Sequence, residues 1–149
     1  MPQLGTAFVR CIGVATLLAA CSPARPVTST APHGAEATLA QVYYWKAKPG
    51  KFEEYSRYVR DVAEPIDAEA HRQGAFVSVT TYVSRDTLSP WTHMRVFLLR
   101  DSVQHAALPA ALARAGERLE PDSVKRRTRA TYSATLRDRV GDALLQILH

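Results

Sequence analysis

The sequence predicts an α+β domain in which helices cover one face of an antiparallel sheet. Two observations lead to this prediction. Apolar side chains recur at steps of three and four between residues 51 and 74, as in an amphipathic helix. Residues 41–46, 76–84 and 91–100 are rich in β-branched and aromatic side chains or alternate between apolar and polar ones, as in strands. The chain after residue 39 has about 110 residues, which suits one domain with one hydrophobic core.

The first 20 residues are expected to be a secretory signal peptide. Residues 1–10 carry one positive charge, Arg10, and no acid, and residues 11–20 are apolar except for Thr16. An apolar run of about ten residues spans about 15 Å as a helix, which is roughly half of a bilayer core. This segment is therefore too short to be a transmembrane helix.

The signal peptide ends in Leu18-Ala19-Ala20-Cys21, which resembles the lipobox of bacterial lipoproteins. The resemblance implies that cleavage occurs before Cys21 and that Cys21 carries a diacylglyceryl thioether, so that the lipid bilayer is a partner of the protein. Two or three acyl chains make such an anchor effectively permanent. Ser22, where an aspartate would direct retention in the inner membrane, implies the outer membrane, facing the periplasm. The alternative is that Cys21 is an incidental small residue after an ordinary signal sequence.

The composition of the remaining chain limits its chemistry. Cys21 is the only cysteine after residue 20, so we expect no disulfide, thiolate metal site or cysteine nucleophile. Residues 21–39 are rich in Pro, Ser, Thr and Ala and predict a flexible linker. Loss of Arg10 with the signal peptide leaves 18 of the 19 basic residues against 14 acidic ones. This mild excess does not favour a nucleic-acid partner.

The first helix is the strongest signal in the sequence. It follows a strand at 41–46 and a Pro49-Gly50 turn, and Gly74 ends it. Pro65 lies inside it and predicts a kink near residues 62–64. Its apolar stripe consists of Phe52, Tyr55, Val59, Val62, Ile66 and Ala70.

The next two strands are expected to form an antiparallel hairpin, because the loop 85–90 between them is short and rich in turn residues. Strand 76–84 places Val77, Val79, Thr81 and Val83 on one face and Phe76, Ser78, Thr80 and Tyr82 on the other. Strand 91–100 places Met94, Val96 and Leu98 on one face and Trp91, His93, Arg95, Phe97 and Leu99 on the other.

Two helices and a final strand complete the predicted domain. A helix over 103–119 is expected to be interrupted at Pro109. A helix from 123 to about 136 is expected to turn Val124, Thr128, Tyr132 and Leu136 inward. Its outer surface would carry Lys125, Arg126, Arg127, Arg129, Arg137 and Arg139. Residues 143–148 either extend this helix or form a last strand, and we favour the strand. The order β-α-β-β-α-β is the ferredoxin-like split pattern.

The segment 43–74 is similar to the dimeric α/β-barrel superfamily, and especially to stress-responsive barrel and NIPSNAP-like domains. The similarity rests on an aromatic strand, Lys48-Pro49-Gly50-Lys51, Glu54-Tyr55 and Glu64-Pro65-Ile66. It implies a homodimer whose two sheets enclose a cleft. A sheet with helices on one side must bury its bare face, which argues independently for a dimer. The superfamily includes cofactor-independent monooxygenases and haem-degrading enzymes.

The expected cleft residues are Tyr44 or its neighbours Tyr43 and Trp45, with Tyr82, Trp91, His93, Arg95 and Phe97. His93 and Arg95 on one strand face can bind an anionic or aromatic small molecule, with His93 as acid or base. The alternative is that His93 is simply hydrogen-bonded at a sheet edge or dimer interface. His71 is either a base beside Glu69 or a helix cap, and His105 is expected to be exposed.

Two functions of different class remain open at this stage. The first is a lipid-anchored homodimer that binds a small molecule or another partner. The second is an enzyme of the barrel superfamily, such as an oxygenase acting on an aromatic or haem-like substrate. The sequence contains no HExxH pair, Gly-rich phosphate loop or Gly-x-Ser-x-Gly elbow, so zinc-protease, nucleotide-binding and hydrolase functions lack support. We expect no metal and no cofactor.

Overall fold

The computed structural model of the chain describes residues 36–148. The predicted signal peptide, Cys21 and residues 22–35 of the predicted linker lie outside this range, as does His149. Within 36–148, none of the helices has the length and apolar character that crossing a membrane requires.

Four antiparallel strands form one sheet. They are β1 (Leu39–Ala47), β2 (Ser78–Val83), β3 (His93–Leu99) and β4 (Arg137–Gln146), in the order β2-β3-β1-β4. β1 and β3 are central, and β2 and β4 are the edges. The sheet confirms the predicted hairpin and the predicted last strand, which begins at Arg137, well before residue 143.

The predicted first helix consists of three parts, α1 (Phe52–Tyr58), the π-helical turn η1 (Val59–Ala63) and α2 (Glu64–Arg72). Pro65 has no N–H to donate to the preceding turn, so the wider turn falls immediately before it. A π-helical turn therefore precedes Pro65, close to residues 62–64 where a kink was predicted. Gly74 adopts a φ of 74°, and the Ala75 N–H donates to the Ala70 carbonyl at 3.1 Å. This is the Schellman arrangement that favours glycine at a helix end.

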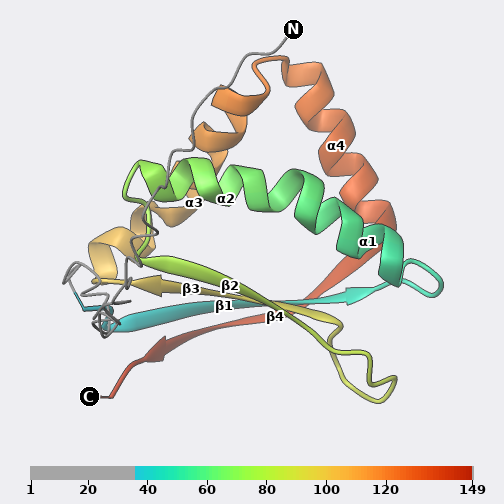
Figure 1. Cartoon of the computed structure of the whole chain (residues 1–149), viewed down its shortest axis with the longest axis horizontal. Helices are drawn as coiled ribbons and strands as arrows, with labels where there is room; N and C mark the ends of the chain where they lie inside the picture. Colours follow the sequence, from blue (N-terminus) through green and yellow to red (C-terminus); the bar gives the residue numbers. More distant parts are fainter. Residues whose placement is uncertain (1–35, 149) are drawn as a thin grey trace, which may run out of the picture. The chain divides into compact units, whose positions relative to one another are not determined.

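The last two helices are α3 (Ser102–Leu119) and α4 (Ser123–Leu136). Asp101 Oδ1 accepts from the Gln104 N–H at 2.8 Å, and Asp122 Oδ1 accepts from the Val124 N–H at 2.8 Å, so each helix has a side-chain N-cap. The prediction that Pro109 interrupts the helix is wrong, because α3 continues through it. All the described helices lie on one side of the sheet (Figure 1).

α4 departs most from its prediction. Val124 is 60% exposed and Tyr132 44% exposed, where both were expected to face inward. Only Ser133 and Leu136 are buried, because α4 approaches the body of the domain only near its C-terminal end. The chain then passes directly into β4 at Arg137. Arg137 and Arg139 therefore belong to the sheet and not to the basic surface of the helix.

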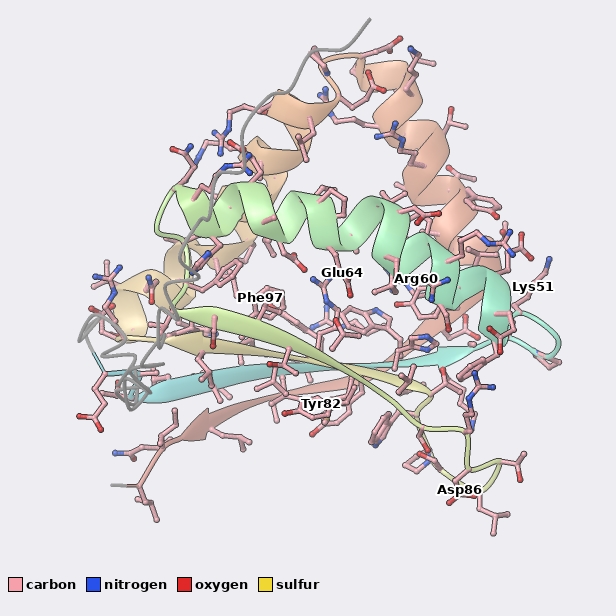
Figure 2. All side chains as sticks on the ribbon, viewed as in Figure 1. Lys51, Arg60, Glu64, Tyr82, Asp86 and Phe97 are labelled. Carbon is pink, nitrogen blue, oxygen red and sulfur yellow. The ribbon has the colours of Figure 1, made fainter. Side chains whose placement is uncertain are left out.

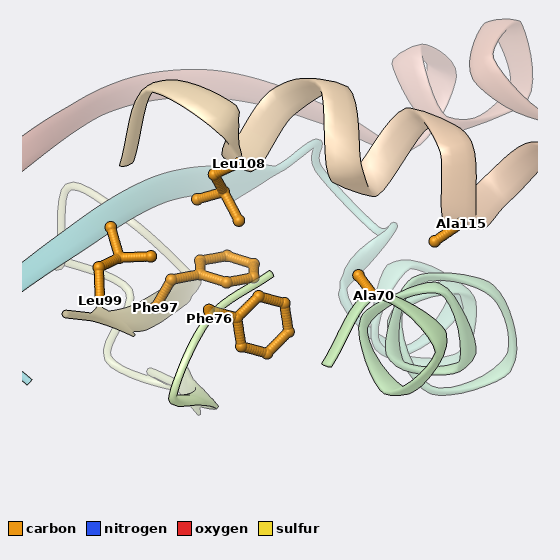
Figure 3. Packing of buried hydrophobic residues seen from close by; sticks show 6 residues of the cluster. All are labelled: Ala70, Phe76, Phe97, Leu99, Leu108 and Ala115. Atoms are coloured by element: carbon orange, nitrogen blue, oxygen red, sulfur yellow. The ribbon is translucent and has the colours of Figure 1, made fainter. Parts of the chain in front are cut away.

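The hydrophobic core lies between the sheet and the helices. One cluster joins α2, α3 and β3 and contains Ala70, Phe76, Phe97, Leu99, Leu108 and Ala115 (Figure 3). Small residues let α2 and α3 approach closely: a Cβ on Gly116 would lie 3.7 Å from the Ile66 side chain. A second cluster contains Ala47, Tyr55, Val59 and Leu136. The first cluster requires Phe97 and Leu99 of β3 to face the helices, and the second requires Ala47 of β1 to face them.

Candidate functional site

The structure divides the six predicted cleft residues between the two faces of the sheet. His93, Arg95 and Phe97 are 1%, 8% and 1% exposed and face the helices. Tyr44 and Tyr82 both pair with Met94, so they lie on the opposite face. Figure 2 shows Phe97 between α2 and the sheet and Tyr82 beyond the sheet. The prediction that the six residues share one face is therefore wrong.

The phase of β3 explains this error. Because side chains alternate along a strand, the apolar set Met94, Val96 and Leu98 must occupy the face that His93 and Arg95 do not. We expected the apolar set to face the helices, but partners on α1 and α2 satisfy the two polar side chains there. Trp91 lies before β3, and its ring is 6.3 Å from the ring of Tyr44. Trp91 therefore lies with Tyr44 and not with His93. Tyr43 and Trp45 face the helices with His93.

His93 is held by a chain of hydrogen bonds that crosses the interior. The Ala47 N–H donates to Thr92 Oγ1 at 2.7 Å, and Thr92 Oγ1 lies 2.9 Å from His93 Nδ1. On the other side, His93 Nε2 lies 3.0 Å from Ser56 Oγ, whose proton goes to the Phe52 carbonyl at 2.8 Å. Because the Ser56 proton goes to the Phe52 carbonyl, Nε2–H is assigned as donor to Ser56. Nδ1 of the neutral ring is then the acceptor, and the Thr92 hydroxyl donates to it at 2.9 Å in preference to the Trp45 carbonyl at 3.3 Å.

The surroundings of this ring keep it uncharged. Aromatic rings flank it, with the Tyr55 ring centroid 4.4 Å away and the Phe52 centroid 5.2 Å away. Burial lowers the pKa of His93 from 6.5 to about 4, because a charged imidazolium would lose its hydration there. His93 is therefore a neutral, doubly hydrogen-bonded side chain at neutral pH.

Arg95 forms a buried ion pair with Asp67 of α2, whose side chain is 5% exposed. Burial lowers the pKa of Arg95 to about 10, and the nearby Tyr55 and Glu64 oppose this shift. Its guanidinium carbon lies 5.1 Å from the Phe97 ring centroid. Among the described residues, no group accepts a hydrogen bond from Arg95 Nε.

A cleft runs beside this polar interior, between the first helix and the edge strand β2. It consists of two cavities of about 260 and 340 Å³, and both are lined by Glu64 and Thr81. The first reaches Ser56 and His93. The second continues past Asp67 to His71. Side chains four residues apart on the helix form one wall: Phe52, Ser56, Arg60, Glu64 and Ala68.

The cavity of about 260 Å³ adjoins a wider hollow of about 820 Å³ at the end of the sheet, between the β1–α1 turn and the β2–β3 loop. Phe52, Glu53 and Arg85 line both spaces. Arg85 pairs with Glu53 at 3.1 Å, and its guanidinium carbon lies 4.9 Å from the Phe52 ring centroid. This exposed ion pair therefore stands at the junction between the hollow and the cleft.

Sequence reasoning missed the partners that complete the site. Ser56, Thr92 and Asp67 carry no motif, and only the helical spacing from Phe52 to Ser56 could have placed a hydroxyl group above the strand. His71 Nε2 lies 3.1 Å from the Val77 carbonyl, next to the end of α2. His105 is not exposed as expected, because its Nε2 lies 2.9 Å from Gln41 Oε1 in the interior. Within 36–148, no three metal-ligating side chains come together.

Comparisons with known proteins identify the fold. No protein-family model matches the sequence, and no curated protein matches it. HapK from Hahella chejuensis superposes with a TM-score of 0.51 at 12% identity, over 74% of this chain and 92% of that protein. This likeness and the strand order confirm the predicted fold class. The chain has the ferredoxin-like α+β fold of dimeric α/β-barrel type.

Two further solved structures resemble the chain. PA3566 from Pseudomonas aeruginosa gives a TM-score of 0.48 at 20% identity, over 78% of this chain and 99% of that protein. SnoaB from Streptomyces nogalater, a cofactor-independent oxygenase, gives 0.44 at 19% identity, over 76% of this chain and 96% of that protein. The fold assignment rests on the likeness to HapK and on the strand order, and a shared fold does not show an activity.

Replacement of His93 should remove a specific acid sensitivity. The folded-state pKa of His93, about 4, lies below its ordinary value of 6.5. As the pH falls from 6.5 to about 4, His93 becomes protonated in the unfolded chain but not in the folded chain. This difference lowers the free energy of unfolding by about 3 kcal/mol. His93→Gln should therefore lose less stability than the wild type between these pH values in urea unfolding. Val124→Gln, an exposed change on α4, should keep the wild-type slope. An equal slope in both variants would contradict the buried neutral state.

Asp67→Asn should destabilise the protein by about 3–5 kcal/mol, because it leaves the buried Arg95 charge without its carboxylate. Asp61→Asn, an exposed change on the preceding turn, should alter stability by no more than about 0.5 kcal/mol. The double variant Asp67→Leu with Arg95→Met should recover most of the loss, because no buried charge remains. Urea unfolding measures all three. A cost for Asp67→Asn no larger than that for Asp61→Asn would show that Arg95 does not depend on Asp67.

Proposed function

We propose that the protein is a lipid-anchored homodimer of the periplasm that binds a small molecule in the cleft between the first helix and β2. The cleft itself carries the proposal. Its two adjoining cavities of about 260 and 340 Å³ fall together in the size range of small-molecule sites. Ser56 and His93 line the cavity of about 260 Å³, and hydrogen bonds hold both side chains in place. These two side chains therefore form a preorganised surface for a ligand.

The lining supports a small aromatic molecule with an acidic group. Phe52, Val59 and Val83 offer apolar surface to a ring, and Ser56 lies beside them. Arg60 lines the same cavity, and its side chain has no ion-pair partner among residues 36–148. Because Arg85 already neutralises Glu53, Arg60 is the cation available to a ligand carboxylate, which would have to lie away from Glu64 in the same cavity.

The alternative is an enzyme of the barrel superfamily, a cofactor-independent oxygenase or a haem-degrading enzyme, with His93 as its base. His93 Nδ1 is its acceptor nitrogen, and the Thr92 hydroxyl occupies it at 2.9 Å. Its lowered pKa, about 4, also makes it a weak base at neutral pH. Both observations favour binding over proton transfer.

The homodimer is proposed to bury the sheet face that carries no helix among the described elements. Tyr44, Val96 and Leu98 lie on this face, and Tyr82 on it is 48% exposed. A sheet needs a second layer to remove such a face from water. A second copy of the chain supplies one by two-fold symmetry.

The anchor is proposed on the pattern Leu18-Ala19-Ala20-Cys21. In the mature protein Cys21 would carry the lipid and a linker of about 18 residues would separate it from β1. A flexible chain of that length averages roughly 20–25 Å. The domain would therefore work close to the surface of the outer membrane, on its periplasmic side.

Native mass spectrometry of the protein purified from its own membrane should show a retained small molecule. Val83→Trp should lose the molecule, because the larger side chain fills the cavity of about 260 Å³ that Val83 lines. Val124→Trp on the exposed part of α4 is the matched control and should retain it. Retention by both variants, or a wild-type protein without any ligand, would count against the cleft.

The same spectra should show a dimer. Thr80→Arg places a charge on the helix-free sheet face, opposite Val96, and should shift the protein to monomer. Thr128→Arg on the exposed face of α4 should leave the dimer intact. A wild-type monomer would overturn the proposed dimer but not the cleft, which lies within one chain.

Cys21→Ala should move the protein from the membrane fraction to the soluble fraction. The lipid supplies the attachment in this proposal, and the linker contributes none. Fractionation with detection by antibody measures the distribution, and Cys11→Ala serves as a control that should stay in the membrane. A Cys21→Ala protein that still sediments with membranes would overturn the lipoprotein interpretation.

A further inference from the structure

A second concave surface lies apart from the cleft, where the end of α2 and the start of β2 meet α3. It is a groove of about 480 Å³. Its charged lining is mostly basic. Arg100 follows β3, and Arg114 and Arg118 lie four residues apart on α3, so they share one side of that helix.

One of the three arginines is fixed in place. Arg118 Nε donates to Glu69 Oε1 at 2.7 Å, and Glu69 is 8% exposed. Glu69 also pairs with Arg72, so both of its carboxylate oxygens already have an arginine partner. The side chains of Arg100 and Arg114 make no hydrogen bond or ion pair with any of residues 36–148. The groove therefore presents two guanidinium groups that have no partner among the described residues.

The rest of the groove is ordered and leaves room for a ligand. Gln104 Nε2 donates to the Gly74 carbonyl at 2.8 Å, and Gln104 Oε1 accepts from the Arg100 N–H at 2.8 Å. Gly74 has no side chain, and a Cβ there would lie 4.0 Å from Arg100 Nη2. Asp101 is the one acid in the lining, and its carboxylate caps α3 at the Gln104 N–H.

We propose that this groove binds a phosphate group. Guanidinium groups match the geometry of phosphate oxygens and can donate two hydrogen bonds at once. The Asp101 carboxylate caps the first turn of α3 at the same groove, so the positive charge offered to a phosphate comes from the arginine side chains. The volume accommodates a phosphate ester as well as the free anion.

The position of the groove gives the phosphate two possible sources. Thr38 Oγ1 donates to the Arg100 carbonyl at 2.6 Å, so the groove lies at the end of the domain where the preceding chain enters. If the chain is lipid-anchored at Cys21, as proposed above, this end is tethered nearest the membrane. The phosphate then belongs either to a lipid headgroup or to a soluble phosphate ester.

The experiment titrates the full chain carrying Cys21→Ala with inorganic phosphate by calorimetry, at constant ionic strength set with chloride. The wild-type groove should bind phosphate saturably. Arg114→Gln and, as a second variant, Arg100→Gln should each weaken binding about tenfold, since each removes a charge-assisted hydrogen bond. Arg127→Gln on the exposed face of α4 should bind as the parent does. Circular dichroism confirms that each variant is folded.

A vesicle arm separates the two sources. Preference for vesicles containing phosphatidylglycerol over pure phosphatidylcholine, lost in Arg114→Gln, would identify a lipid headgroup. Phosphate binding without that preference would identify a soluble phosphate ester. No saturable phosphate binding, or equal binding by Arg114→Gln and Arg127→Gln, would overturn the proposal. Because neither the Cys21 anchor nor the small-molecule cleft is needed for the phosphate arm, its outcome is independent of the proposed function.

Discussion

The buried ion pair between Arg95 and Asp67 is the constraint on which the rest of the domain depends. A guanidinium this far from water is tolerated only with a carboxylate beside it, so α2 must lie over β3 at this point. That requirement sets the phase of β3, because its side chains alternate. Because Arg95 faces the helices, His93 and Phe97 face them as well. The alternate residues of β3 then face the other side of the sheet, and these are Met94, Val96 and Leu98.

The same phase produces the polar end of the cleft. With His93 inward, its ring lies between the hydroxyl groups of Ser56 on α1 and Thr92 before β3, and the chain of hydrogen bonds continues to the β1 backbone. A fully satisfied network of this kind rigidifies the interior. The π-helical turn η1 follows α1, and its residues Val59 and Arg60 line the cleft. The helix therefore departs from regular α-helical geometry where it borders the cleft.

α3 and α4 play unequal roles in this arrangement. α3 packs closely on α2 through Ala70, Ala115 and Gly116 and completes the core. Most of α4 stands away from the body, and the Tyr132 hydroxyl group fastens its C-terminal half to Glu54 of α1 at 2.6 Å. Hydrogen bonds from Lys51 and from Tyr132 lower the pKa of Glu54. The cleft beside β2 and the arginine-lined groove beside α3 have no lining residue in common.

Most of the elements and their order could be predicted from the sequence, because local periodicity and turn chemistry act within a few residues. The stripe from Phe52 to Ala70, the turn at Pro49-Gly50, the stop at Gly74 and the irregularity before Pro65 were all readable in this way. Three features depend on contacts between distant elements and were not predictable in this way: the buried face of β3, the point where α4 passes into β4, and the set of residues that meet at the cleft. The sequence predicts His93 and Arg95 in a cleft between the sheets of two subunits. They are buried because Ser56, Thr92 and Asp67, distant in sequence or without any motif, supply the hydrogen bonds and the counter-charge that burial requires.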